Sequence, residues 1–207
     1  MSELIITLPP ANWQRLDSGR ATAARQMEID CALLENFNTG DLKDSLIRWY
    51  GWERECATFG KNQDEELVRQ LVGPEMEISR RPTGGGICIH GPDDSAVSIF
   101  IPRKMGLGTV RLFRRWLRWE LSQSMEADIL PRGNGLSPWC DERFSGEEIV
   151  KDGRKILALS LLSGRSVFLL QGNMRGDHTL KRNLRAFRRG NHAGFLAPNP
   201  LVALLSE

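Results

Sequence analysis

Short β-rich runs follow one another along the chain, and this succession constrains the fold more than any other feature of the sequence. The runs cover residues 46–50, 55–59, 76–79, 86–90 and 96–102, and three more lie at 148–151, 154–162 and 166–171. Glycine, proline or charged turn residues bound the runs. Because strands in series with the helices set apart are typical of α+β domains, we expect a mixed or largely antiparallel sheet with flanking helices.

The helices that flank this sheet are predicted at residues 22–37, 64–71 and 110–125, and a basic helix is expected at 179–189. The core stripe expected for the first helix consists of Ala23, Met27, Cys31 and Leu34. The helix at 110–125 carries two neighbouring stripes, one formed by Leu112, Trp116 and Trp119 and the other by Phe113, Leu117 and Leu121. An amphipathic helix of this kind packs against another element.

The clearest local signal is the dipeptide Asp152-Gly153, which separates the β-rich runs 148–151 and 154–162. Aspartate and glycine tolerate the positive φ angles that a two-residue hairpin turn requires. We therefore predict a β-hairpin at this point of the chain.

Length and charge favour one globular domain without a nucleic-acid partner. The 207 residues are close to the usual size of a domain, so residues 1–207 are expected to form a single one. The 28 Lys and Arg residues nearly balance the 26 Asp and Glu residues, whereas a dedicated nucleic-acid binder usually has a strong basic excess. The N-terminus has no signal-peptide pattern and the chain has no long apolar run, so we expect a cytoplasmic protein without a membrane partner.

The cysteines and histidines show no metal-binding pattern. Cys31, Cys56, Cys88 and Cys140 are widely separated, and so are the three histidines. Neither a disulfide framework nor a zinc motif has such spacing, so we expect free thiols and no metal site.

The most distinctive run is Arg80-Arg-Pro-Thr-Gly-Gly-Gly-Ile-Cys-Ile-His90, in which two cations and three glycines separate two strands. Backbone N–H groups can approach a ligand closely where side chains are absent, and nearby cations suit a phosphate or a developing oxyanion. A glycine triplet is also common in tight turns, so the pattern alone leaves both interpretations open.

These residues resemble those of the lipoate-protein ligases and octanoyltransferases, which acylate a lysine of lipoyl carrier domains. The resemblance covers most of the chain and lies in residues 27–30, 48–52, 58–63, 80–90 and 152–156, with Ser98 downstream. It implies the biotin/lipoate-ligase α+β fold and a glycine loop that lines the acyl and acyl-adenylate site. The substrate-binding residues expected on this basis are Arg80, Arg81, Thr83, Gly84, Gly85, Gly86, His90 and Ser98.

The resemblance also implies that Lys155 holds the acyl carbonyl or a leaving phosphate, where its charge offsets charge that develops during transfer. A lone lysine is otherwise usually a surface residue. Strand alternation places Lys155 on one face with Leu157, Leu159 and Leu161, which suggests a cation at the mouth of an acyl tunnel.

Cys140 lies 15 residues before Lys155, a spacing that resembles one octanoyltransferase subgroup. In that subgroup a cysteine accepts octanoate as a thioester before the carrier lysine receives it, and a neighbouring cation would supply the reactive thiolate. An inert, buried thiol is the alternative interpretation of Cys140. Cys88 and His90 share a strand face, so a Cys/His pair is a further alternative, although core packing is the default interpretation of Cys88.

Three functional hypotheses follow, and the departures of the sequence from the family pattern bear on them. Residues 158–160 replace a Gly-Ser-Ala-like segment, Gln171 stands where a histidine is typical, and no C-terminal accessory domain is expected. The leading hypothesis is transfer of an octanoyl or lipoyl group to a lipoyl carrier domain, with an acyl carrier protein as a candidate donor and no tightly bound cofactor. The others are a lipoate ligase that uses ATP and Mg²⁺, and a non-catalytic protein that binds an acyl group or a partner.

Overall fold

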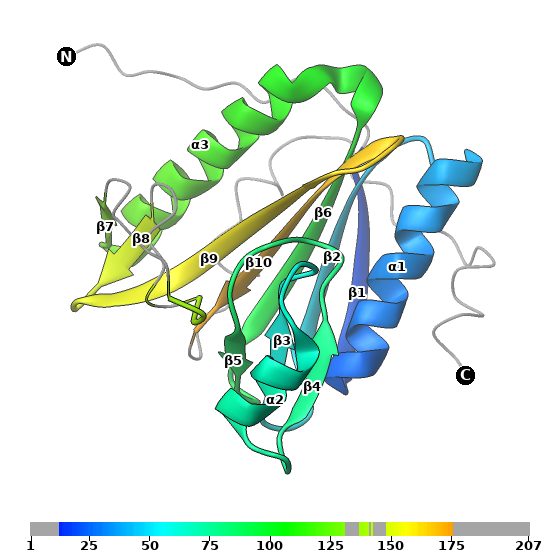
Figure 1. Cartoon of the computed structure of the whole chain (residues 1–207). Coiled ribbons are helices and arrows are strands. Elements are labelled where there is room, and N and C mark those ends of the chain that lie inside the picture. The colour runs from blue at the N-terminus through cyan, green and yellow to red at the C-terminus, as the bar shows by residue number, and fades with distance from the viewer. Residues whose placement is uncertain (1–12, 131–136, 141, 143–147, 176–207) are drawn as a thin grey trace.

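The computed structural model describes residues 13–130, 137–140, 142 and 148–175, and it shows an α+β fold (Figure 1). The helices are α1 (Ala23–Thr39), α2 (Glu65–Val72) and α3 (Gly106–Met125), and a 3₁₀ turn, η1 (Arg103–Met105), precedes α3. The strands are β1 (Trp13–Ala21), β2 (Ser45–Trp52), β3 (Cys56–Phe59), β4 (Glu77–Arg80), β5 (Cys88–His90), β6 (Ser95–Pro102), β7 (Asp128–Leu130), β8 (Glu148–Lys151), β9 (Arg154–Ser163) and β10 (Val167–Met174).

The strands form a main sheet and a small sheet. The main sheet has the order β1-β2-β6-β10-β9-β8-β7, with a parallel pair at β1 and β2 and antiparallel pairs elsewhere. The small sheet has the order β4-β3-β5, in which β4 is parallel and β5 antiparallel to β3. Both sheets are therefore mixed, as the sequence predicts.

Helices α1 and α3 cover opposite faces of the main sheet (Figure 1). Leu33 of α1 packs in one core cluster with Leu46 of β2, whereas Phe113 of α3 packs in another with Ile47, the next residue of that strand. Successive strand residues point to opposite faces, so the sheet forms the middle layer. In the part of the chain that the structure describes, no helix is long and apolar enough to cross a membrane.

The buried face of α1 differs from the predicted stripe. Ala23 and Met27 are buried as expected, but Cys31 is exposed and Leu34 is only half-buried. The polar residues Gln26 and Asp30 take core positions instead, together with Ile29, Leu33 and Phe37. The spacing of apolar residues does not predict this face, because two of its buried residues are polar and contact partners on a strand that is distant in the sequence.

The described side chains of α3 that belong to the two predicted stripes differ in burial. Phe113 and Leu117 are buried, whereas Leu112 is 45% exposed. Arg118 is buried too. The predicted side-chain positions of Trp116, Trp119 and Leu121 lie outside the described residues.

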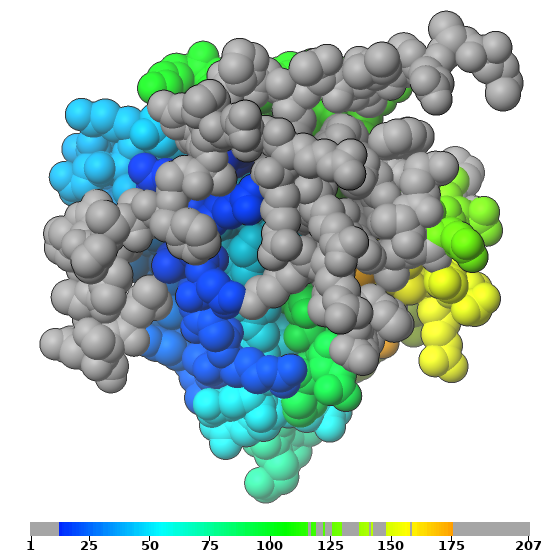
Figure 2. All heavy atoms as spheres, turned by 180° about the vertical axis from the view of Figure 1, so that it is seen from behind, coloured from blue at the N-terminus to red at the C-terminus, as the bar shows by residue number. Residues whose placement is uncertain are grey.

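Two strands escape the sequence analysis. Strand β1 is polar and lies at an edge of the main sheet, where Figure 2 shows it in blue at the surface. Strand β7 has three residues and forms the other edge. Edge strands lack the alternating apolar pattern because only part of their surface is buried. The basic helix predicted at 179–189 lies outside the described residues.

The predicted β8–β9 hairpin is confirmed, and its register changes the position expected for Lys155. Asp152 and Gly153 both have positive φ, at 51° and 72°. Val150 pairs with Lys155 and Ile149 pairs with Leu157, so one step along β8 spans two residues of β9. This bulge at Ile156 puts Lys155 on the face of Val150, opposite Leu157. The predicted row of Lys155 with Leu157, Leu159 and Leu161 is therefore wrong, because alternation assumes an unbroken ladder.

Candidate active site

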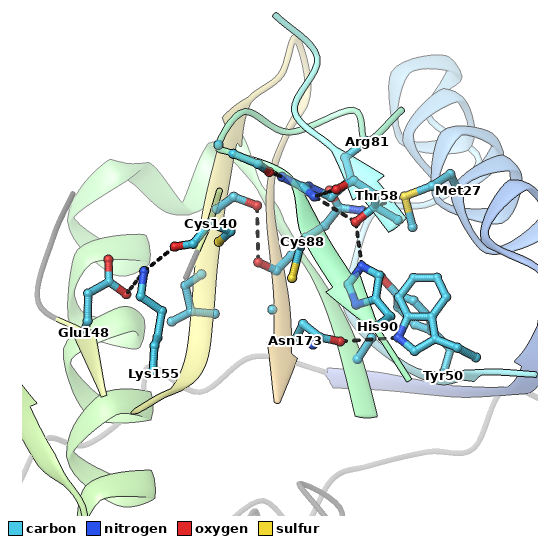
Figure 3. Close-up of a pocket in the computed structure, with 18 residues that line it drawn as sticks. Met27, Tyr50, Thr58, Arg81, Cys88, His90, Cys140, Glu148, Lys155 and Asn173 are labelled. Carbon is cyan, nitrogen blue, oxygen red and sulfur yellow. Dashed lines mark hydrogen bonds and ion pairs between the residues drawn. The ribbon is translucent and has the colours of Figure 1, made fainter. Parts of the chain in front are cut away.

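A cavity lies where the small sheet meets the main sheet (Figure 3). Its walls come from α1, both sheets, the loop that contains Gly85 and Gly86, and the segment that contains Cys140. Figure 3 shows Cys140, Glu148 and Lys155 toward one end and Met27, Tyr50 and His90 toward the other. The lining residues are Met27, Tyr50, Trp52, Thr58, Arg81, Gly85, Gly86, Cys88, His90, Ala96, Cys140, Glu148, Lys155, Leu159, Ser160, Gln171, Gly172 and Asn173.

Arg81 holds the glycine loop from inside. Its Nη1 donates to the carbonyl oxygen and the hydroxyl of Thr58 at 2.8 and 2.7 Å, and its Nη2 donates to the carbonyl oxygen of Gly86 at 2.7 Å. The backbone N–H groups of Gly84, Gly85 and Gly86 donate to none of the described residues. Two of these residues, Gly85 and Gly86, line the cavity, so a ligand there would lie beside their backbone.

The three glycines of this loop meet different surroundings. A Cβ on Gly84 would contact nothing within 4 Å, whereas a Cβ on Gly86 would lie 2.6 Å from the carbonyl oxygen of Pro138 and 2.8 Å from the nitrogen of Cys140. This close approach lets Ile87 accept from the N–H of Cys140 at 2.6 Å and donate to Pro138 at 2.7 Å. The segment of residues 137–140 is therefore docked on the loop through backbone contacts.

Cys140, Lys155 and Glu148 form one group of contacts at the cavity. Lys155 Nζ donates to the carbonyl oxygen of Cys140 at 2.7 Å and lies 3.6 Å from Glu148 Oε2. The Lys155 side chain is only 3% exposed and the Glu148 side chain 9%. Burial of an ammonium requires a counter-charge, which Glu148 supplies.

A buried polar network supports the glycine loop from behind the cavity. Thr83 donates to Gln171 Oε1 at 2.5 Å, and Gln171 Nε2 donates to Asp30 Oδ2 at 2.6 Å. Asp30 also accepts from Ser98 at 2.6 Å and from Arg48 at 2.7 Å. Thr83 and Ser98 belong to this network and do not line the cavity.

His90 lies in the cavity wall as a neutral imidazole. Its Nε2 is 2.7 Å from the hydroxyl of Thr58, and its ring stacks on Trp52 with centroids 4.1 Å apart. Burial and, to a smaller extent, the nearby Arg81 lower the pKa of His90 to about 3. Cys88 lines the same cavity, but a neutral His90 bonded to Thr58 does not provide the charged partner that an activated thiolate needs.

A comparison with protein families identifies the family of this chain. The profile of the lipoyl protein ligase A/B catalytic domain matches residues 22–193. This chain belongs to that family. The resemblance in the sequence and the fold class expected from it are thereby confirmed.

Curated relatives and solved structures of ligases are similar to this chain. Octanoyltransferase LipM of Oceanobacillus iheyensis is 27% identical over 179 residues, which cover 78% of this chain and 63% of the relative. LipM of Bacillus subtilis is 26% identical over 180 residues, covering 78% and 64%. The chain thus spans slightly less than two thirds of the length of these relatives.

Two solved structures show the same fold at low sequence identity. Lipoate-protein ligase A bound with ATP has a TM-score of 0.61 at 15% identity, covering 94% of this chain and 82% of the other. LipL1 of P. falciparum in complex with lipoate has a TM-score of 0.56 at 14% identity, covering 93% and 58%.

The structure brings together only some of the residues that the sequence nominates for the lipoyl ligase site. Arg81, Gly85, Gly86, His90, Cys140 and Lys155 line the cavity. Arg80 lies outside it, where its Nη1 donates to the carbonyl oxygens of Lys61 and Gln63 at 3.1 and 2.7 Å. Gly84, Thr83 and Ser98 also lie outside the lining.

Sequence reasoning missed Glu148. The available signal was an acidic residue at the start of a predicted strand, seven positions before Lys155. All four cysteines are free thiols, and Cys140 is the one beside Lys155. Within the described residues, no three His, Cys, Asp or Glu side chains are grouped to hold a metal ion.

Proposed function

We propose that this chain moves an octanoyl or lipoyl group onto a lysine of a lipoyl carrier domain through a thioester on Cys140. The observation that carries this proposal is the hydrogen bond of 2.7 Å between Lys155 Nζ and the backbone of Cys140, at a cavity that the glycine loop also lines. The names of the LipM relatives support octanoyl transfer in particular.

In the first step, the Cys140 thiolate attacks the carbonyl carbon of an acyl thioester, for which an acyl carrier protein is the proposed donor. The negative charge that forms on the carbonyl oxygen is stabilised by the Lys155 ammonium and by N–H groups of Gly85 and Gly86. The bond between the carbonyl carbon and the donor sulfur then breaks. The donor leaves as a thiol with the proton that Cys140 gave up.

In the second step, the amine of the carrier lysine attacks the Cys140 thioester, and the amide forms as the Cys140 thiol is released. The acyl chain needs an apolar environment during the lifetime of the Cys140 thioester. Met27, Trp52, Ala96 and Leu159 supply apolar surface to the cavity that reaches away from Cys140. Arg81 and Thr83 are assigned to shaping the loop, and Ser98 to the network behind it.

This route needs an acylated donor and no resident cofactor, whereas a ligase route would need ATP and Mg²⁺ to form an acyl-adenylate. Incubation with octanoyl-acyl carrier protein should give an acyl-enzyme that mass spectrometry detects. Cys140→Ser should abolish it, or leave a slowly formed oxygen ester, because a serine hydroxyl without a base is a weak nucleophile. Cys31→Ser, which changes an exposed thiol, serves as the control.

Full activity of Cys140→Ser with the octanoyl donor would overturn the thioester route. ATP–pyrophosphate exchange that depends on lipoate would then support the ligase. Failure of both assays in a protein that still binds octanoate would indicate a non-catalytic acyl-binding protein.

A further inference from the structure

Glu148 has a buried carboxylate that the two steps above do not use. It begins β8 and lines the same cavity as Cys140 and Lys155. Its Oε2 lies 3.6 Å from Lys155 Nζ, which is an ion pair but is beyond hydrogen-bond length. No described residue donates a hydrogen bond to this carboxylate, whose residue is only 7% exposed.

A buried carboxylate is costly unless donors satisfy its oxygens. Lys155 balances the charge of Glu148 but, at 3.6 Å, donates no hydrogen bond to it. The carboxylate oxygens of Glu148 can therefore accept further hydrogen bonds at the end of the cavity where the thioester would form. A cation with N–H donors, such as an ammonium group, would supply these hydrogen bonds.

We propose that Glu148 binds the ammonium group of the acceptor lysine and takes its proton before the amine attacks. This inference rests on the proposed function. An acceptor ammonium that approaches Cys140 meets the like charge of Lys155, and the Glu148 carboxylate beside Lys155 offsets the repulsion. Among the described residues that line the cavity, Glu148 is the one carboxylate.

The proton balance of the step is complete without another reactant. The ammonium gives one proton to the Glu148 carboxylate, and the free electron pair on nitrogen attacks the thioester carbonyl carbon. The bond between that carbon and Cys140 Sγ breaks, and the excess proton on nitrogen goes to the departing thiolate. The amide keeps one N–H, and Glu148 then returns its proton to water.

The other titratable groups that face the cavity are poor proton acceptors for this step. They are Tyr50 of β2, Arg81 of the glycine loop, Cys88 and His90 of β5, Cys140 and Lys155. Burial and the nearby Asp30 raise the pKa of Tyr50 well above its ordinary value, and His90 has a pKa of about 3. Arg81 and Lys155 are cations, and Cys140 carries the acyl group.

The test compares two nucleophiles on the acyl-enzyme of Glu148→Gln. A lysine of the lipoyl domain arrives protonated at neutral pH, whereas hydroxylamine arrives uncharged and needs no base. Both rates are measured on acyl-enzyme that has already formed, because Glu148 is also the counter-charge of Lys155 and its loss affects acylation. The hydroxylamine rate reports any such effect on the second step. Transfer to the lysine should fall by about 100-fold or more at pH 7, the usual loss on removal of a general base.

The loss should shrink as the pH approaches about 10, where the lysine deprotonates by itself. Glu148→Asp, which keeps a carboxylate, should retain more lysine transfer than Glu148→Gln, and Glu28→Gln provides a matched control on an exposed, ion-paired carboxylate. Equal losses with both nucleophiles would show a structural role, and unchanged lysine transfer would exclude the base. Either result overturns the proposal.

If Glu148→Gln does not fold, the ratio of the lysine rate to the hydroxylamine rate in Glu148→Asp decides the question. A ratio equal to that of the wild type at every pH overturns the proposal, and a reduced ratio supports it. Failure of the wild type to form any acyl-enzyme would instead refute the proposed function.

Discussion

A Gly86→Ala substitution probes how the Cys140 segment is held over the cavity. The added Cβ would lie 2.6 Å from the carbonyl oxygen of Pro138, 2.8 Å from the nitrogen of Cys140 and 2.9 Å from the carbonyl carbon of Trp139. All three are backbone atoms, so the segment of residues 137–140 must move away from the loop. Its two backbone hydrogen bonds with Ile87, at 2.6 and 2.7 Å, would then be lost.

The magnitude follows from those two bonds. At about 1 kcal/mol each, their loss disfavours the docked segment by about 2 kcal/mol. Since 1.4 kcal/mol corresponds to a factor of ten, the equilibrium constant for docking should fall by about 30-fold. We expect the rate of Cys140 acylation to fall with the docked fraction, by up to that factor, because a displaced thiol no longer faces the donor carbonyl.

The assay is single-turnover acyl-enzyme formation followed by mass spectrometry, with thermal unfolding as a check of the fold. Gly84→Ala is the matched control, because its Cβ would meet nothing within 4 Å and its φ is not positive. Gly84→Ala should acylate at close to the wild-type rate. Wild-type acylation by Gly86→Ala would refute the reasoning, since it would mean that the docked position of the segment does not matter.

Three further predictions concern charge. Lys155→Met should reduce acyl transfer by about 100-fold, and it should lower the Tm because Glu148 loses its buried counter-charge. Adding Glu148→Gln should restore the Tm but not the activity. An unchanged Tm in Lys155→Met would contradict the pairing of Lys155 with Glu148. The exposed Arg111 and Arg115 of α3 should steer an acidic carrier domain, so the second-order rate should fall between about 0.05 and 0.5 M salt, and a flat rate would exclude steering. Burial lowers the pKa of His90 from 6.5 to about 3, so on acidification the unfolded state protonates His90 before the folded state does. The free energy of unfolding should therefore fall as the pH drops from 6.5 toward 3. In chemical denaturation, His90→Gln should flatten this pH dependence.

The predictions that rely on local patterns agree with the structure. The helix at 22–37 begins after Thr22, whose hydroxyl accepts from the N–H of Arg25 at 3.2 Å, and it ends at Gly40. The hairpin at Asp152-Gly153 forms because both residues take positive φ. Such features depend on a few neighbouring residues, so the sequence contains everything that decides them.

The position of Lys155 and the buried face of α1 required the tertiary structure. A bulge at Ile156 moves Lys155 to the other face of β9, and its register depends on the partner strand β8. Asp30 is buried in α1 because Arg48, 18 positions away, neutralises it at 2.7 Å. Periodicity contains no information about such distant partners.

The sequence by itself determined the three described α-helices, most of the strands, the hairpin and the glycine loop as the place to look for chemistry. Only the tertiary structure decided that Gly86 meets the Cys140 segment, that Arg80 faces away from the cavity, and that Glu148 lies beside Lys155. The physical reason is that local conformation is set by short-range sterics and hydrogen bonds, whereas a site is assembled by contacts between residues far apart in the chain. Because these contacts are buried, the loss of either partner of a polar contact is costly in free energy.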